Sequence, residues 1–442
     1  MARGRRSKRI RGSGGSNKKL PLNQLIPLGI QHVLAMFAGN ITVPIIIAGI
    51  FGQTTDEKIF LIQMALFVAG VATIIQTVGY KNIGSRLPII QGTSFAFIPV
   101  MAPFAKVGLG VVFTAAFIGG IFQIWIGRML KPIRHMFPPL VTGIVVLMIG
   151  VSLLKVGFMY AGGGGWLMNN KPEIFGNANH LIIAFTVLIV ALIAHQKGKG
   201  MVSSASILIG MVAGYIVAML MGMINYGKIT SAAWFAMPMP FQYGIAWDTA
   251  AVVLMLFMAI VTTIETIGDI SATTMGGANR EATDKELSGG IMADGLGTAF
   301  GSIFNAMPNT SYSQNAGLVA FTGVISRHVG TVAGIMLILL GLFPKLGGII
   351  AAMPESVIGG AAIIMFGLIT AAGIKLISQS EMNQRNILIL ALSLSFGIGM
   401  SLLPQFVAQI PDFGIKLKLL LTTGLIPAGL LAFILNTTLP KK

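Results

Sequence analysis

Long apolar runs recur from Leu25 to Leu435, and most approach the length of about 20 residues that an α-helix needs to cross a bilayer. Only 10% of the residues are charged, against about 25% in a typical soluble domain. A transmembrane β-barrel would instead show short segments in which apolar and polar residues alternate. The runs therefore predict an all-α polytopic membrane protein.

The apolar runs divide into fourteen segments. Their expected limits are 24–50, 59–79, 88–103, 108–128, 138–157, 181–195, 202–223, 249–273, 288–304, 313–325, 329–351, 357–378, 386–403 and 415–437. With the N-terminus inside, the cytoplasmic side holds 22 of the 30 Lys and Arg residues, and the outer loops hold eight. Cytoplasmic loops of membrane proteins carry such an excess. We therefore expect fourteen transmembrane segments and cytoplasmic termini.

Part of the net charge of +17 comes from residues 1–19, which contain eight basic side chains among Gly and Ser residues. We interpret this stretch as a cytoplasmic tail that fixes topology near anionic membrane lipid, with no role in binding nucleic acid. There is no cysteine, and the five histidines lack the spacing of a metal site. No nucleophile–base pair or phosphate loop is visible, so we expect no metal, no cofactor and no enzymatic activity.

The third and tenth segments differ from the others because they are short and rich in Gly, Ser, Thr and amides. Thr93 and Gln314 in these segments lie 221 residues apart, half of the 442-residue chain. Interrupted segments at matching places in two halves are typical of a transporter whose site lies between inverted repeats. Seven segments per half is an odd number, so the second repeat should be inverted relative to the first.

Three carboxylates lie in or at the edge of apolar segments. Glu265 and Asp269 share one helix face because four positions separate them. Two ionised acids there would repel each other, so one should be protonated or have a hydrogen-bonding partner. Asp294 could have a functional role, cap a helix or make a polar contact in the core. A purely structural role remains open for each of the three carboxylates. His32, in an apolar segment, is expected to pair with one of the acids.

Several short motifs resemble one family. QNAGLVAFTG at 314–323 resembles the signature of the nucleobase–ascorbate transporters, in which Gln, Glu or Pro precedes Asn-x-Gly, four residues and Thr. Similar stretches occur in order as QHVLAMFAG, QGTSFAF, ETIGDISAT, ADGLG and PNTSYSQN. The resemblance runs from about Leu20 to the C-terminus. Gln at the first signature position is similar to the xanthine and uric acid permeases of bacteria, whereas uracil permeases typically carry Glu.

The resemblance implies a fold of two inverted seven-segment repeats. Segments 1–4 and 8–11, at 20–135 and 247–353, would form a core domain. Segments 5–7 and 12–14, at 136–246 and 354–442, would form a gate domain. Interrupted segments 3 and 10 would each contain a short strand facing a half-helix, with substrate between them. Family members are commonly homodimers, and this one would lie in the bacterial plasma membrane.

The resemblance also implies a function: proton-coupled import of xanthine, uric acid or both, by an elevator motion, with protons rather than sodium as the coupling ion. Phe95 would stack on the flat ligand and Gln314 would make a two-point amide contact. The residues that would bind substrate are Glu265, Gln314, Ser94, Phe95 and Asn315. Those that would support the site and the proton network are Asp269, Asp294 and His32.

Other substrates remain open from the sequence. A uracil or other nucleobase permease, an ascorbate transporter or an anion transporter could share the fold, and a channel is a further alternative. A channel would show no saturation and no proton dependence. The motifs alone do not separate xanthine from uric acid.

Overall fold

The computed structural model describes residues 16–129, 138–407, 409 and 417–440, so most of the predicted basic tail lies outside the described residues. Within these ranges, eight helices are long and apolar enough to cross a membrane. A pair of helices bent by 77°, α15 (Arg327–Gly341) and α16 (Pro344–Ala351), would make nine if the pair forms a single span. The chain is therefore a multi-pass, mostly helical membrane protein.

The long helices coincide closely with the predicted apolar runs. In chain order they are α1 (Leu22–Ile50), α2 (Thr55–Val78), β1 (Gln91–Thr93), the 3-10 helix η1 (Phe95–Phe97), α3 (Ile98–Met101), the 3-10 helix η2 (Ala102–Phe104), α4 (Leu109–Arg128), α6 (Pro139–Ala161), α7 (Gly165–Asn170), α8 (Ala178–Lys197), α9 (Met201–Ser204), α10 (Ser206–Leu220), α11 (Gly227–Ser231), α12 (Thr249–Ala278), α13 (Asp284–Ile303), β2 (Asn309–Ser311), α14 (Ser313–Thr322), α15 (Arg327–Gly341), α16 (Pro344–Ala351), α17 (Glu355–Ile377), α18 (Gln384–Leu402), the 3-10 helix η3 (Pro404–Val407), α19 (Leu417–Thr422) and α20 (Leu425–Thr438).

Each of the fourteen predicted segments contains helical residues, but they differ in length. α14 has ten residues, about 15 Å of helix, against a hydrocarbon layer of about 30 Å. It cannot cross a membrane alone. The prediction of fourteen spans therefore stays a prediction, while the helical character of the apolar runs is confirmed.

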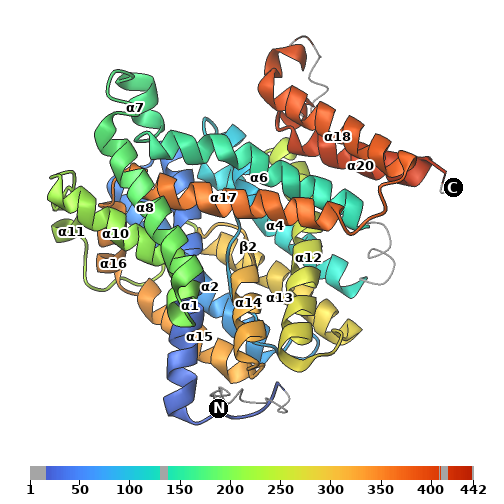
Figure 1. Cartoon of the computed structure of the whole chain (residues 1–442), viewed down its shortest axis with the longest axis horizontal. Coiled ribbons are helices and arrows are strands. Elements are labelled where there is room, and N and C mark those ends of the chain that lie inside the picture. Colours follow the sequence, from blue (N-terminus) through green and yellow to red (C-terminus); the bar gives the residue numbers. More distant parts are fainter. Residues whose placement is uncertain (1–15, 130–137, 408, 410–416, 441–442) are drawn as a thin grey trace, which may run out of the picture.

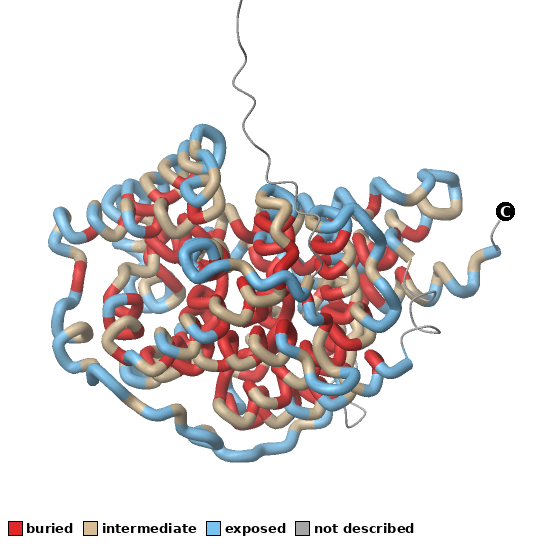
Figure 2. Tube along the Cα trace, turned by 90° about the horizontal axis from the view of Figure 1, so that it is seen from below, coloured by how far each residue is buried: buried red, intermediate tan, exposed pale blue. Residues whose placement is uncertain are grey.

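The helices pack in two groups (Figure 1). In one group, α6 packs along α17, α8 along α10 and α18 along α20. In the other, α4 packs against α12 and α13, and α2 packs against α15. Figure 2 shows that buried residues fill the middle of the molecule, whereas exposed residues dominate the outer loops. The candidate site lies in the second group, where α12, α14 and the two strands meet.

Small residues let α6 and α17 approach closely. Gly143, Gly150 and Gly157 recur every seven residues on α6, and a Cβ at any of them would press on atoms of α17. On α17, a Cβ at Gly359 would lie 2.0 Å from the backbone nitrogen of Ala161. The contact at Gly359 is therefore backbone against backbone, which a rotamer change cannot relieve.

We expect Gly359→Ala to lower the melting temperature of the purified protein, because overpacking of this kind costs about 1–3 kcal/mol. Gly367→Ala is the matched control, since it lies on the same helix and an added Cβ would have no atom within 4 Å. The control should raise stability slightly because Ala is a better helix former than Gly by about 1 kcal/mol. Thermal unfolding in detergent measures both, and equal shifts would contradict the packing argument.

The two strands form a small antiparallel sheet inside the molecule. Gln91 pairs with Ser311, Gly92 with Thr310 and Thr93 with Asn309. Inside a membrane protein, such a pair satisfies backbone groups that lipid cannot. The strands implied for the third and tenth segments are thus present, each followed by a short helix.

A glycine is required in β1. A Cβ at Gly92 would lie 2.6 Å from Oδ1 of Asn40 and 2.8 Å from the ring of Tyr312. α1, which carries Asn40, can therefore press directly on the strand. This close approach positions the start of the site against α1.

Candidate functional site

The site is built around the point where each strand gives way to a short helix. β1 leads into η1 at Phe95, and β2 leads into α14 at Ser313. Because the strands are antiparallel, the two short helices leave the sheet at opposite ends. The first N–H groups of a helix lack partners within that helix, and this end carries partial positive charge. Two such helix starts beside one small sheet make a site suited to polar or negatively charged groups.

Glu265 on α12 reaches the middle of β2. Its Oε2 accepts a hydrogen bond from the hydroxyl of Thr310 at 3.4 Å. The side chain is half-buried, whereas Asp269, one turn further along, is only 6% exposed. Glu265 is therefore the more accessible of the two acids, and its carboxylate keeps free lone pairs.

Asp269 joins α12 to the start of α14. Its Oδ2 accepts from the hydroxyl of Ser311 at 2.5 Å, and its Oδ1 accepts from that of Ser313 at 2.6 Å. Ser313 is the first residue of α14, where a negative charge is favourable. The expected hydrogen-bonding partner for one of the paired acids is thus present, and both acids have one.

Asp294 on α13 is fully buried among polar groups of neighbouring helices. Its Oδ2 accepts from the hydroxyl of Thr266 and from Nε2 of Gln123 at 3.4 Å. Its Oδ1 is buried and has no hydrogen-bond partner among the described residues. Of the alternatives left open by the sequence, the helix cap is excluded, because Asp294 lies mid-helix and links α13, α12 and α4.

Among the described residues His32 has Asn315 and no acid as its side-chain partner, so that prediction is wrong. The side-chain nitrogen of Asn315 lies 2.9 Å from Nδ1 of His32 and also donates to the His32 carbonyl at 2.9 Å. Both side chains are buried. The physical reason is that α1 packs against α14 at this point, which places an amide opposite the imidazole. His32 therefore fixes the first turn of α14 relative to α1.

The remaining predicted residues lie at the starts of the two short helices. Ser94 is buried, and its hydroxyl accepts from the backbone N–H of Ala96 at 3.3 Å, so it caps η1. Phe95 meets Phe366 of α17 edge to face, with ring centroids 5.5 Å apart. Gln314 lies in the first turn of α14 and is exposed. Phe95 thus stands where the two helix groups meet.

Several supporting residues were not among those assigned to the site from the sequence. The Tyr312 hydroxyl donates to the Thr93 carbonyl at 2.8 Å, and Asn40 Oδ1 accepts from the Thr93 N–H at 2.8 Å. Asn309 donates to Gln91 Oε1 at 2.7 Å. These bonds hold the two strands to each other and to α1. The signal that could have found them is their polarity within apolar segments.

Gln123 and Thr266 carry no comparable signal, because isolated amides and hydroxyls are common in membrane helices. Only the packing of α4 and α12 against α13 brings them to Asp294. Within the described ranges, no group of three or more His, Asp or Glu residues is arranged to hold a metal ion.

Comparison with known proteins gives consistent matches over nearly the whole chain. A model of the permease family (Xan_ur_permease) matches residues 23–406. The xanthine permease of Bacillus subtilis is 36% identical over 415 residues, covering 93% of this chain and 92% of that protein. The uric acid permease PucJ of Bacillus subtilis is 34% identical over 416 residues, with coverages of 93% and 92%. The xanthine permease XanP of Escherichia coli is 36% identical over 436 residues, with coverages of 96% and 93%.

Solved structures share the fold at low identity. The murine anion transporter Slc26a9 in its inward-facing state matches with a TM-score of 0.64 and 14% identity, over 95% of this chain and 69% of that one. The transmembrane domain of the bicarbonate transporter BicA from a cyanobacterium matches with a TM-score of 0.57 and 14% identity, over 96% of this chain and all of that one. At this identity the likeness concerns the fold alone.

Proposed function

Because this chain belongs to the permease family and is 34–36% identical to xanthine and uric acid permeases over more than nine-tenths of its length, we propose that it carries a purine nucleobase across the membrane. Its family consists of transporters, so it is a permease and not an enzyme. The proposed substrates are xanthine and uric acid. The alternative is that the same site carries uracil or another nucleobase.

The observation that carries this proposal is the position of Glu265. Its half-buried carboxylate lies against Thr310 of β2, beside two helix starts. A purine dione offers N–H donors that alternate with carbonyl acceptors along its edge. A carboxylate accepts from the N–H groups, while the amide of Gln314 can both donate and accept. A purine without the matching edge would leave these groups unpaired, which is costly and gives selectivity.

Ser94, Phe95 and Asn315 complete the proposed binding site. Phe95 supplies an aromatic face for the flat ring, and its contact with Phe366 keeps it at the boundary between the helix groups. Ser94 follows β1 and caps η1, and Asn315 holds the first turn of α14 through its contacts with His32. N–H groups at the starts of both short helices would meet carbonyl oxygens of the ligand.

We propose proton symport, and the same arrangement supports it. Asp269 and Asp294 carry carboxyl groups with hydroxyl or amide donors, and a carboxyl held inside a membrane protein is expensive when charged. Coupling requires that substrate and proton favour the same conformational state. We assign the proton network to Asp269 and Asp294, with His32 and Asn315 holding the geometry, and protons rather than sodium as the coupling ion.

The proposed motion is of the elevator type. Residues 20–135 and 247–353 would form the moving core, and 136–246 and 354–442 the gate. α6 packs against α17, whereas α2 packs against α15 and α4 against α13. These separate pairs support such a division. We further propose fourteen spans in two inverted repeats, a homodimer, and location in a bacterial plasma membrane with both termini cytoplasmic.

Uptake of radiolabelled xanthine into energised cells tests the proposal. We expect saturable uptake that urate blocks, that uracil leaves unchanged and that a protonophore abolishes. Cells carrying an empty vector give the background. If uracil but not urate blocked uptake, the proposed substrate would be uracil instead. Uptake that persists after addition of the protonophore would exclude proton coupling. Absence of uptake of xanthine, urate and uracil would refute the assignment.

A further inference from the structure

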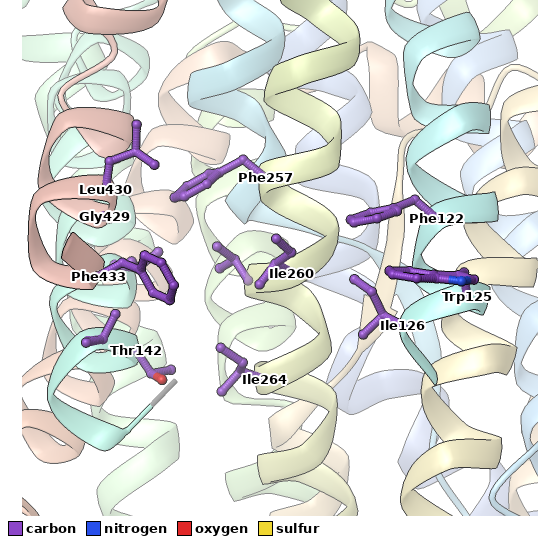
Figure 3. A pocket seen from close by; sticks show the side chains of 13 residues that line it. Phe122, Trp125, Ile126, Thr142, Phe257, Ile260, Ile264, Gly429, Leu430 and Phe433 are labelled. Atoms are coloured by element: carbon purple, nitrogen blue, oxygen red, sulfur yellow. The ribbon is translucent and has the colours of Figure 1, made fainter. Parts of the chain in front are cut away.

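A cavity of about 270 Å³ lies between α4, α12, α6 and α20, away from the candidate site (Figure 3). Phe122 and Trp125 of α4 face Ile260 of α12 across one part of it, and Phe433 of α20 lies at the other side. Among the thirteen described lining residues, two side chains carry a polar group. The Thr142 hydroxyl already donates to the Pro138 carbonyl at 3.2 Å, and the indole nitrogen of Trp125 lies at the end of the ring away from Ile260 (Figure 3). The described lining is therefore almost wholly apolar.

The cavity continues into the apolar outer surface of the molecule. On α4, Phe117, Ile121 and Trp125 follow one another at intervals of four, Met129 continues the row directly after the helix, and all four are 39–50% exposed. On α20, Leu430 is 45% exposed and lines the cavity. Since α4, α6 and α12 are long and apolar enough to cross a membrane, these side chains would face the hydrocarbon of the bilayer.

The lining decides which molecule fits. Water needs two to four polar partners in a buried site, and the described walls provide only the already bonded hydroxyl of Thr142. A nucleobase would leave most of its hydrogen-bonding groups unpaired there. A hydrocarbon chain leaves no polar group unpaired on entering from the bilayer, and it gains van der Waals contacts with walls that otherwise border a void.

We propose that this cavity binds one acyl chain of a membrane phospholipid, which enters from the side past Trp125 and Leu430. Arg128 is exposed at the end of α4, three positions beyond Trp125. A lipid chain that enters beside Trp125 can therefore place its phosphate near a cation at the end of the helix.

The bound chain lies between the two helix groups. α4 and α12 carry the Asp294 network through Gln123 and Thr262, while the adjacent residues Phe122 and Val261 line the cavity. α6 and α20 belong to the other group. The lipid chain thus fills the boundary between the groups directly behind the polar network. This inference stands independently of the substrate.

The test uses the full chain in lipid nanodiscs of phosphatidylcholine doped with phosphatidylcholine that carries a photoactivatable diazirine on its acyl chain. After irradiation, mass spectrometry locates the adducts. We expect them to concentrate on α12 between Phe257 and Ile264, above the level at Ile189, a half-exposed residue of α8. Equal levels at both places would overturn the proposal.

Two variants and a control sharpen the result. Ile260→Trp fills the cavity and should lower the adduct yield there about tenfold, equivalent to about 1.4 kcal/mol. Phe433→Ala enlarges the cavity and should raise the yield, so the proposal stays testable if the Trp variant fails to fold. Ile189→Trp, on the outer face of α8, should leave the cavity adducts unchanged. An unchanged yield in a folded Ile260→Trp protein, or a fall with Phe433→Ala, would refute acyl-chain binding.

Discussion

Replacing Glu265 with Gln is expected to abolish concentrative uptake of xanthine. The Gln side chain keeps the shape of Glu and can still accept from Thr310, but it loses the charge. Hydrogen bonds to charged groups contribute about 1.5–3 kcal/mol, so affinity should fall about ten- to hundredfold. Concentrative uptake should be lost as well, because protons at Asp269 and Asp294 can be coupled only to a substrate that is bound. Initial uptake rates over a range of xanthine concentrations measure both effects.

The matched control is Glu281→Gln, which removes a carboxylate from an exposed position between α12 and α13. It should transport like the wild type. Surface expression of each variant is measured alongside, so that loss of uptake is not confused with loss of protein. If a normally expressed Glu265→Gln protein accumulated xanthine to the wild-type level, the assignment of Glu265 to substrate binding would be refuted.

Removing the carboxylate of Asp269 should abolish uptake and also destabilise the protein. In Asp269→Ala the hydroxyl of Ser311, which is 2% exposed, loses its partner, and a buried unsatisfied group costs about 1–3 kcal/mol. The link between α12 and the start of α14 is lost at the same time, because Ser313 also bonds to Asp269. Uptake and thermal unfolding in detergent measure the two consequences separately.

Asp269→Asn separates structure from charge. The amide keeps the size of the carboxyl and can bond to both serines, since their hydroxyls rotate to donate or accept. We expect most of the thermal stability to return while uptake stays near background. Ser313→Ala alone should have a smaller effect on uptake, because the bond to Ser311 remains. Full transport by Asp269→Asn would show that Asp269 only holds α14 in place.

The spacing of residues predicted correctly that Glu265 and Asp269 share one face of a helix. Both accept a hydrogen bond from β2, and Asp269 also accepts one from the start of α14. The interruptions at 88–103 and 313–325 were visible from their small and polar residues, and each lies at a strand followed by a short helix. These features are local, since they depend on helical periodicity and on breaks within one segment.

The rest of the site depends on contacts between distant helices. His32 was assigned to an acid, but the packing of α1 against α14 gives it Asn315. Gln123 was not singled out, because its role arises only where α4 meets α13. A single sequence does not specify which helices become neighbours or how they are rotated. Polar residues were therefore located correctly, while several of their partners were not.

The pairing of β1 with β2 also bears on how the protein is synthesised. The bond between Gln91 and Asn309 joins residues 218 positions apart. At about 5–20 residues per second, translation reaches β2 some 10–40 s after β1. During that interval the backbone groups of β1 lack their partner strand, and lipid cannot hydrogen-bond to them. The first half of the chain must therefore keep this segment shielded until the second strand arrives, and a nascent chain that stops before β2 lacks half of the two-stranded sheet on which the proposed site is built.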